Sequence, residues 1–380
     1  MDLLEYQGKR LFARHAVPVP DGRHATTVDD AVAAAEEVGY PCVVKAQVAI
    51  GKRGKAGGIK VAKDTAEAHR HAEAILGMDI RGFVVHDLWI EAASEIAAEY
   101  YASVILDRSE KKLLVMLSRM GGMDVEEMAE TDPEALVRRH VEPSEDFDAD
   151  AARQLAIDAG IDDDVTDAVA EMLVKLVDVA LAEDATLIEI NPLIVTSERE
   201  VIALDSKATI DNNALFRHEE LAELTDKSAE DPHETMAKEK GLTYVKLDGN
   251  VGILANGAGL CMSTLDVVAQ AGGDPANFLD AGGGSKAEAI VDALEVITAD
   301  EKVSAILFNI FGGITRCDEI ARGIIEASEQ IEIEVPLVVR LDGTNSEEGL
   351  ALLAEADLEN LHQEQTMLGA AEKVVELASA

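Results

Sequence analysis

The stretch PCVVKAQVAIGKRGKAGGIKV, residues 41–61, decides how the first half of the chain is interpreted. It begins as an apolar strand that carries Lys45, and it continues as a loop with four glycines and three more cations, Lys52, Arg53 and Lys55. Glycines let backbone N–H groups approach an anion closely, and the cations supply positive charge. The Walker pattern GxxxxGK[ST] and the dinucleotide pattern GxGxxG are both absent from it. We therefore expect a phosphate-binding loop of another kind; the alternative is a basic loop on the surface.

A second candidate site lies in the predicted hairpin 186–208, which reads TLIEINPLIV, a turn TSERE, and VIALDSKA. Because side chains alternate along a strand, Glu189 and Asn191 share one face. The five-residue turn sets a register that places Asn191 across from Asp205. Oxygen ligands on one face, with a carboxylate two residues away, predict a magnesium site beside bound phosphates. The alternative is the polar outer face of an ordinary hairpin.

The second half of the chain repeats one pattern, in which an apolar strand, a glycine-, asparagine- or serine-rich loop and an amphipathic helix follow one another. The expected strands are 251–255, 277–280, 304–310, 335–341 and a weaker one near 360–362. The loops NGAGL, AGGGS, FGGIT and DGTN each lead into a helix, whose free N–H groups face any anion there. The pattern predicts a flavodoxin-like, doubly wound parallel sheet with ligands at the edge where these loops gather.

The first half mixes helical patterns with antiparallel strand patterns. Asp2 is expected to cap an opening helix that ends before Pro18, and a long acidic region over 133–184 is expected to be helical. The polar stretch 227–247 is interpreted as the joint between the halves. Further expected elements are a helix over 28–38 and strands in 41–48, 83–93, 99–107 and 112–118. We set the domains at residues 1–236 and 237–380.

Charge limits the partners that this chain can have. Lys and Arg total 33 against 74 Asp and Glu, which gives a net charge of −41, while 48% of the residues are hydrophobic. Such a surface repels nucleic acid and anionic membranes, so neither is an expected partner. Normal apolar content with this much acid predicts the solvated surface of a halophilic protein, with an ordinary acidic protein as the alternative. With no long apolar stretch and no apolar signal region, the expected location is the cytoplasm.

Cysteines and histidines give no sign of a nucleophile. Cys42, Cys261 and Cys317 are isolated, and we expect buried thiols rather than a disulfide or a zinc site. The nine histidines lie outside the basic loop, the hairpin and the glycine loops, and none is paired with a Ser or Cys nucleophile. We therefore expect no covalent phosphate carrier in this chain.

Taken together, these motifs resemble the β subunits of succinyl-CoA synthetase along nearly the entire chain. The resemblance rests on LLEYQGKRLFARHAVPVP, RGKAGG, IEINPL, NALFRH, NGAGL, ANFLDAGGG, NIFGGITRCD and PLVVRLDGTN. It implies an ATP-grasp fold for the first half and a flavodoxin-like CoA-ligase domain for the second. It also implies Mg²⁺, ATP or ADP as nucleotide substrate, and a partner α subunit, in an αβ or α2β2 assembly, that binds CoA and carries the phosphorylated histidine.

The resemblance also implies roles for individual residues. Those implied for the nucleotide are Lys45, Lys52, Arg53, Gly54, Glu91, Ser94 and Glu99. Asn191 and Asp205 match the magnesium ligands, and catalytic Glu189 would face the visiting phosphohistidine. Asn256, Gly313, Ile314 and Thr315 match the residues that touch the acid substrate. The bacterial pattern has Gly, Thr and Val where this chain has Lys52, Ser94 and Thr315, which leaves the choice between ATP and GTP open.

We interpret the chain as part of a reversible ligase of the tricarboxylic acid cycle, which converts ATP, succinate and CoA to ADP, phosphate and succinyl-CoA. A sister ligase that acts on malate shares all these motifs. A nicotinamide-binding oxidoreductase is suggested by the glycine loops, but the absent GxGxxG and the basic loop weigh against it. A nucleotide sensor without catalytic activity is the third alternative.

Overall fold

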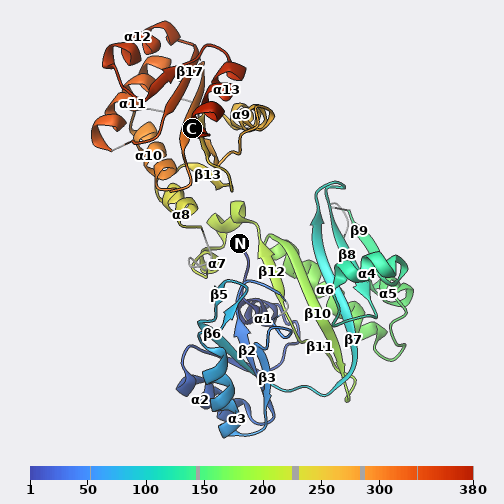
Figure 1. Ribbon diagram of the computed structural model, residues 1–380. Helices are drawn as coiled ribbons and strands as arrows, with labels where there is room; N and C mark the ends of the chain where they lie inside the picture. Colours follow the sequence, from blue (N-terminus) through green and yellow to red (C-terminus); the bar gives the residue numbers. More distant parts are fainter. Residues whose placement is uncertain (52, 143–145, 225–230, 283–286, 332, 380) are drawn as a thin grey trace. The chain divides into compact units, whose positions relative to one another are not determined.

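The computed structural model describes the chain except for residues 52, 143–145, 225–230, 283–286, 332 and 380 (Figure 1). It divides into two compact units, Met1–Asp226 and Lys227–Ala380, each with its own sheets and core. The domain boundary expected from the sequence lies ten residues later, between residues 236 and 237. The difference concerns α8 (Pro232–Glu239), which packs on α10 and β13 of the second unit.

The first part of unit 1 is a four-stranded antiparallel sheet covered by two helices (Figure 1). Its strand order is β1 (Gly22–Ala25), β6 (Asp87–Ala92), β2 (Cys42–Gln47) and β3 (Ile59–Ala62). The helices α2 (Val28–Val38) and α3 (Thr65–Ile75) begin where Thr27 and Asp64 accept backbone N–H bonds. Small alanines on their inner faces let both helices lie close to the strands. The sheet therefore fixes the position of β2, which leads into the basic loop.

A second antiparallel sheet forms most of the rest of unit 1, which also holds the short pair β4 (Asp79–Ile80) and β5 (Phe83–Val84). Its order is β11 (Val201–Ala203), β10 (Ala185–Thr196), β7 (Ile96–Asp107), β8 (Lys112–Ser118) and β9 (Val137–Val141), with β12 (Lys207–Ile210) also on β10. Helices α5 (Ala149–Asp158) and α6 (Thr166–Ala182) pack together, and α6 covers β10 and β7. The prediction of helix throughout 133–184 is wrong for β9. That strand forms by pairing with β8, a contact that the local pattern does not reveal.

The predicted hairpin register is confirmed. Val195 pairs with Val201, the ladder is interrupted after Ala203, and it resumes at Glu189, which pairs with Lys207. Asn191 and Asp205 therefore occupy facing positions within the interruption. The alternation is confirmed too, because Ile188 and Ile190 are fully buried whereas Glu189 and Asn191 are only half-buried.

The opening helix α1 (Glu5–Arg14) exists, but its expected cap is wrong. Leu4 is the N-cap residue, and its N–H donates to Gln7 Oε1 at 2.9 Å. Asp2 instead bridges to Thr209, whose hydroxyl donates to its carboxylate, so the chain start extends the second sheet. Every residue from Glu5 to Lys9 is buried, which places charged side chains of α1 inside unit 1.

Unit 2 is a doubly wound sheet, as expected. Its order is β13 (Thr243–Lys246), β15 (Asn277–Asp280), β14 (Val251–Ala255), β16 (Ala305–Gly312), β17 (Leu337–Gly343) and β18 (Leu361–Gln363). The five parallel strands follow the order 2-1-3-4-5, the flavodoxin-like arrangement. β13 is a correction: within the stretch interpreted as a polar joint, it forms an antiparallel edge strand on β15. Its partner lies some thirty residues later in the chain.

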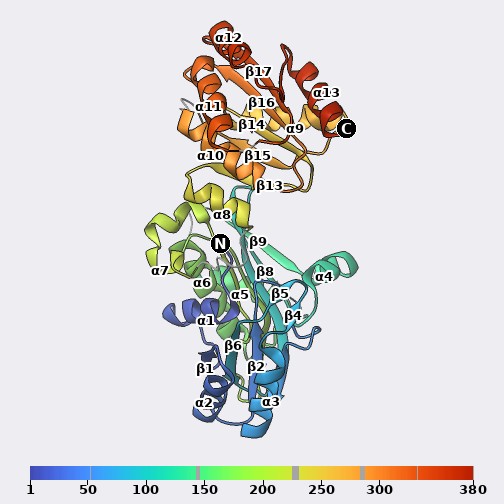
Figure 2. The same cartoon turned by 60° about the vertical axis from the view of Figure 1, so that its left-hand side comes forward.

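Helices cover both faces of this sheet (Figure 2). α9 (Ala258–Gln270) and α13 (Met367–Ala378) pack together on one face, while α10 (Ala287–Thr298), α11 (Cys317–Gln330) and α12 (Ser346–Ala356) form a row on the other. The strand VGILA of β14 is accordingly buried at every residue, as strands of a parallel sheet are. The three cysteines are buried, as expected. Among the described helices, none has the length and apolarity to cross a membrane.

Candidate functional site

Five buried charged side chains meet beside the basic loop. Glu5 and Lys9 come from α1, Lys45 from β2, Arg53 from the loop after β2, and Glu91 from β6. The Glu5 carboxylate contacts all three cations: its Oε1 lies 2.8 Å from Lys9 Nζ and 3.0 Å from Lys45 Nζ, and its Oε2 lies 2.7 Å from Arg53 Nη1. Glu91 contacts both Lys9 and Lys45. We call these five residues the ion cluster.

Polar neighbours hold the carboxylates of the ion cluster in place. Trp89 Nε1 donates to Glu91 at 2.8 Å, and the Gln47 amide donates to Glu5 at 3.4 Å. Gln47 is itself fixed, because its Oε1 accepts from Tyr6 N at 3.0 Å. Buried charges remain in a fold only when they are paired and hydrogen-bonded, and this cluster meets that requirement.

The cluster keeps its members charged. Burial alone would raise the pKa of Glu5, but Lys45, Lys9 and Arg53 bring that pKa well below its ordinary value. Burial alone would lower the pKa of Lys45, but Glu5 and Glu91 outweigh it, so the pKa is raised. At neutral pH, Lys45 and Arg53 therefore carry full positive charge in a place almost free of water.

Arg53 joins the basic loop to the hairpin. Its Nη2 lies 3.2 Å from Asp205 Oδ1, although the two residues are 152 positions apart in the chain. Lys45 Nζ donates to the carbonyl of neighbouring Leu204 at 3.2 Å. Two motifs that the sequence analysis singled out separately thus form one site. Lys52 lies outside the described residues, and Gly54 lies in an exposed turn after Arg53.

The hairpin face supplies oxygen atoms that suit magnesium. Asn191 Oδ1 accepts from Gly122 N at 2.7 Å and keeps a second lone pair, while Asp205 offers a carboxylate at the facing position. Hard oxygen donors of this kind fit Mg²⁺, which retains several non-protein ligands. Within the described part of the chain, no three His, Cys, Asp or Glu side chains gather as a metal site. Phosphate oxygens and water would therefore have to complete the coordination.

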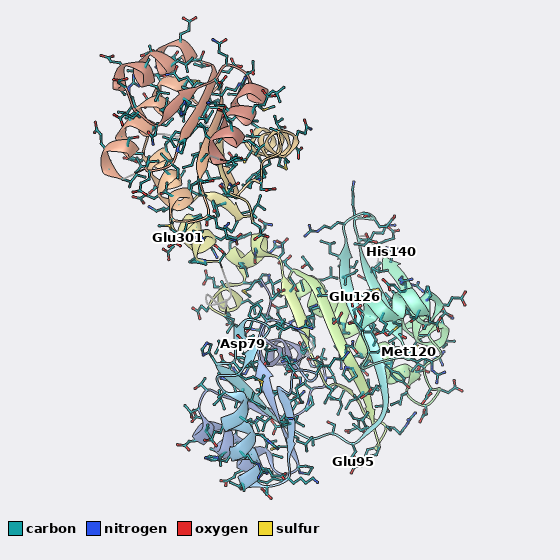
Figure 3. The ribbon with its side chains drawn as sticks, viewed as in Figure 1. Asp79, Glu95, Met120, Glu126, His140 and Glu301 are labelled. Atoms are coloured by element: carbon teal, nitrogen blue, oxygen red, sulfur yellow. The ribbon has the colours of Figure 1, made fainter. Side chains whose placement is uncertain are left out.

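Glu189 is held by a tyrosine that the sequence analysis did not single out. Tyr101 Oη, on β7, donates to Glu189 Oε2 at 3.1 Å. Burial raises the pKa of Glu189, which Lys207 and the Tyr101 bond partly oppose. Burial and the Glu189 carboxylate raise the pKa of Tyr101, so its hydroxyl stays protonated and donates. Glu126 of α4 (Val125–Thr131), labelled in Figure 3, adds negative charge on this side of the sheet.

The other three residues expected to bind the nucleotide differ in how exposed their side chains are. Glu91 has no exposed surface, and its carboxylate points into the ion cluster. Ser94 is half-buried just after β6, and Glu99 is exposed on β7. Glu99 lies against Gly122, where a Cβ would meet its Oε2 at 2.6 Å. The side chain of Glu91 therefore orients cations, whereas those of Ser94 and Glu99 have surface to offer a ligand.

In unit 2, the glycine loops after β14 and β16 are tied together. Asn256 Nδ2 donates to the Phe311 carbonyl, and Asn256 Oδ1 accepts from the Phe311 N–H, each at 2.9 Å. These strands are the first and third of the parallel order, so the tie lies at the point where the order reverses. Parallel-sheet proteins bind ligands at such points.

The three residues of the FGGIT loop expected at the acid substrate differ in exposure. Gly313 is exposed, and Ile314 has 89% of its surface exposed. Thr315 is only 2% exposed, so its side chain is part of the loop's interior. The loop therefore offers backbone N–H groups and Ile314 to a ligand, with Thr315 supporting them.

Asp318 anchors this loop and was not found by the sequence analysis. It is fully buried at the start of α11, where its carboxylate accepts from Arg316 at 3.0 and 3.1 Å and from Arg322 at 2.9 Å. Asn345 of the DGTN loop donates to the same carboxylate at 3.0 Å. The Arg316 bond is the main cause that lowers the pKa of Asp318, against a smaller effect of burial. One carboxylate thus links two glycine loops of unit 2.

Five of the nine histidines bond carboxylates away from the site. His15, His24, His140, His218 and His233 each bond a carboxylate outside the ion cluster and the hairpin face.

Glu5, Lys9 and Tyr101 complete the set of site residues that sequence reasoning missed. The spacing of Glu5 and Lys9 on the expected first helix, i and i+4, is the signal that could have revealed that pair.

Comparisons with known proteins agree with both units. Residues 2–195 match the family model described as ATP-grasp domain, and residues 254–374 match the one described as CoA-ligase. The ADP-forming succinate–CoA ligase β subunit of Rubrobacter xylanophilus is 52% identical over 378 residues, which cover 100% of this chain and 99% of that protein. The β subunits of the same name from Halorubrum lacusprofundi and Halobacterium salinarum are each 50% identical over 379 residues, covering 100% of this chain and 99% and 98% of theirs.

Among solved structures, ATP citrate lyase from Methanothrix soehngenii, in complex with citrate and coenzyme A, matches with a TM-score of 0.76. The match covers 99% of both chains at 19% sequence identity. At that identity it supports the fold alone, and it supports it over the full length.

Proposed function

The chain belongs to the family of ADP-forming succinate–CoA ligase β subunits, and from that premise we propose how its residues carry out the reaction. The reaction is the reversible conversion of ATP, succinate and CoA to ADP, phosphate and succinyl-CoA, a step of the tricarboxylic acid cycle. A separate α subunit, in an αβ or α2β2 assembly, binds CoA and supplies the histidine that carries phosphate. The supporting observation is the contact of Arg53 with Asp205, which joins the basic loop and the hairpin into one site.

Unit 1 binds the nucleotide. Lys45 and Arg53 hold the phosphates, the turn at Gly54 offers backbone N–H groups, and Ser94 and Glu99 contact the rest of the nucleotide. Asn191 and Asp205 hold Mg²⁺, which offsets negative charge on the phosphates when bound. Because the ion cluster fixes both cations in a nearly dry place, their charge acts strongly on a transferring phosphoryl group.

Glu189 receives the histidine of the α subunit. A carboxylate held by Tyr101 accepts a ring N–H, fixes which nitrogen faces the γ-phosphate, and favours the cationic ring. In unit 2, Asn256 holds the Phe311 loop so that Gly313 and Ile314 face the acid substrate, with Thr315 behind them. The phosphoryl group passes from histidine to succinate, and CoA then displaces phosphate from the succinyl phosphate. One difficult step is thereby split into easier ones.

The test is a short labelling experiment followed by a thioester assay. The full chain, with and without its co-expressed α subunit, receives γ-labelled ATP and Mg²⁺, and the subunits are separated on a gel. We expect base-stable, acid-labile label on α and none on this chain. CoA-thioester formation is then measured with succinate and, separately, with malate, each with ATP and GTP.

Label on this chain in the absence of α would mean that one of its nine histidines carries the phosphate, and the division of roles would be wrong. Faster thioester formation with malate than with succinate would mean that malate, and not succinate, is the acid substrate. The ratio of the ATP and GTP rates assigns the nucleotide.

A further inference from the structure

Two residues of the ion cluster, Glu5 and Lys9, lie next to the phosphate-binding cations but are themselves buried. We propose that they are positioning residues for the nucleotide. In this proposal, Glu5 orients Lys45 and Arg53, and Lys9 neutralises the buried carboxylates so that these cations remain available to phosphate. The inference rests on the proposed function, because it takes Lys45 and Arg53 as the phosphate ligands.

Geometry separates Lys9 from the ligand. Lys9 is 1% exposed, and its Nζ contacts Glu5 and Glu91, both of which also contact Lys45. Lys9 therefore cannot touch a nucleotide, yet it shares both carboxylate partners of a residue that can. Its effect on binding must pass through those shared carboxylates.

Charge balance gives Lys9 its role. The cations Lys9, Lys45 and Arg53 face the carboxylates of Glu5, Glu91 and Asp205, three against three. Without Lys9, the fully buried carboxylates would depend on Lys45 and Arg53 alone. A buried carboxylate without a partner is strongly unfavourable, so both cations would be held back from a phosphate that competes for them. With Lys9 present, Glu5 and Glu91 each keep a contact with one cation when Lys45 and Arg53 turn to the ligand.

Glu5 has the opposite effect on affinity and a separate effect on geometry. Its two oxygens hold Lys45 Nζ at 3.0 Å and Arg53 Nη1 at 2.7 Å, so one carboxylate sets the separation of the two cations. It also competes with phosphate for them. Replacing Glu5 by neutral glutamine removes the competition but leaves the cations less well oriented. Affinity and turnover should therefore respond differently to this change.

A purely structural role for the pair makes another prediction. If Glu5 and Lys9 only fastened α1 to the sheet, removing either charge would loosen the same site. Nucleotide affinity and turnover would then fall together in both variants, in proportion to the loss of stability. The sign of the affinity change in Glu5→Gln separates the two explanations.

The experiment uses the full chain and its complex with the α subunit. The dissociation constant of Mg·ADP is measured by calorimetry, turnover by thioester formation, and folding by the melting temperature. The variants are Lys9→Met, Glu5→Gln and the double change, with Arg10→Met as control, because Arg10 is the next residue of α1 and is exposed. The control removes the same charge without touching the ion cluster.

We expect Lys9→Met to weaken Mg·ADP binding about tenfold, equivalent to ~1.4 kcal/mol. Glu5→Gln should bind Mg·ADP as tightly as the wild type or up to about threefold more tightly, with kcat reduced about tenfold. The double variant, in which charge balance is restored, should recover most of the affinity lost in Lys9→Met. Arg10→Met should match the wild type in affinity and turnover.

Weaker binding in Glu5→Gln would overturn the proposal, and so would wild-type affinity in Lys9→Met. If Lys9→Met does not fold, Glu5→Gln and the double variant still decide the question. Failure of the wild type itself to bind Mg·ADP would overturn the proposed function as well, which distinguishes that outcome from a failure confined to Glu5 and Lys9.

Discussion

At the scale of single residues, the site depends on side chains whose roles follow from what they touch. Glu189 and Asn191 lie two residues apart on one strand face, but Glu189 bonds Tyr101 while Asn191 bonds the loop at Gly122 and Met123. The alternation of a strand predicts that the two share a face, and it does so from sequence alone. It cannot predict their partners, because Tyr101 arrives from β7, a strand 88 positions away.

Glu189→Gln should separate activity from stability. Burial raises the pKa of Glu189 above its ordinary 4.5, so ionisation is harder in the folded than in the unfolded chain. The stability that this group contributes is full below the unfolded pKa and is lost as pH rises through the folded pKa. Glutamine does not titrate, so the variant should gain stability relative to the wild type as pH rises from 4 and hold that gain at pH 7. Labelling of α should meanwhile fall about 10²-fold.

Melting temperatures between pH 4 and 8, with initial labelling rates, check this prediction. Tyr101→Phe is the companion variant, because it removes only the hydroxyl that donates to Glu189. We expect its labelling rate to fall about tenfold, in line with the loss of one hydrogen bond to a charged group. A Glu189→Gln protein that melts lower than the wild type at pH 7 would contradict the account.

At the scale of elements, what the sequence can predict depends on whether an element is defined by local pattern. The helix over 28–38, the five parallel strands of unit 2 and the hairpin register follow from periodicity and turn length, and all are present. β9 and β13 do not follow from local pattern. Each is an edge strand that forms by pairing with a neighbour, β8 or β15, from another part of the chain. The sequence does not predict the ion cluster for the same reason. The pattern of α1 is that of an ordinary amphipathic helix, and only its contacts with β2 and β6 reveal the cluster.

Close docking of α1 is the element-scale condition for the ion cluster. Gly8 lies between Gln7 and Lys9, and a Cβ there would meet Ser206 Oγ at 2.2 Å and Ser206 Cβ at 3.2 Å. Ser206 follows Asp205, so the glycine brings the helix against the hairpin. Any side chain at this position would push α1, and with it Lys9, away from Glu91 of β6.

Gly8→Ala should therefore destabilise the protein by about 1–3 kcal/mol, as overpacking of a filled core does. Alanine favours a helix by roughly 1 kcal/mol over glycine, so the steric effect has to exceed that gain. Ser206→Ala in the same chain removes the atom at 2.2 Å and should restore most of the lost stability. Denaturant unfolding of both single variants and the double variant measures the coupling. Equal destabilisation with and without the Ser206 change would exclude this contact as the cause.

At the scale of the whole molecule, the dominant quantity is charge. The 33 basic residues leave a net −41 even if each is paired with one of the 74 acids. Together with Asp205, the ion cluster is balanced, so the excess lies elsewhere in the chain, and the sequence predicts this property fully. The halophilic origin and the cytoplasmic location that we expected remain predictions of the sequence.

The last prediction concerns salt. Exposed like charges repel, and the screening length shrinks from about 30 Å at 0.01 M to about 3 Å at 1 M salt, so the folded state of a −41 chain should gain most from added ions. We expect the melting temperature to rise steeply with potassium chloride into the molar range. A variant with Gln at the exposed positions Glu355, Glu359 and Glu372 should melt higher than the wild type in dilute buffer and converge with it in molar salt.

In the matched control, an uncharged osmolyte at equal osmolality replaces potassium chloride. The osmolyte does not screen charge. Screening acts on the surface and not on the buried ion cluster. The ratio of the Mg·ADP affinities of Lys9→Met and the wild type should therefore stay nearly constant across the salt range in which the melting temperature rises. A melting temperature that stays flat from dilute buffer to multimolar potassium chloride would mean that repulsion among the excess acids does not limit stability. The acidic surface would then need another explanation, because the charge itself is fixed by the sequence.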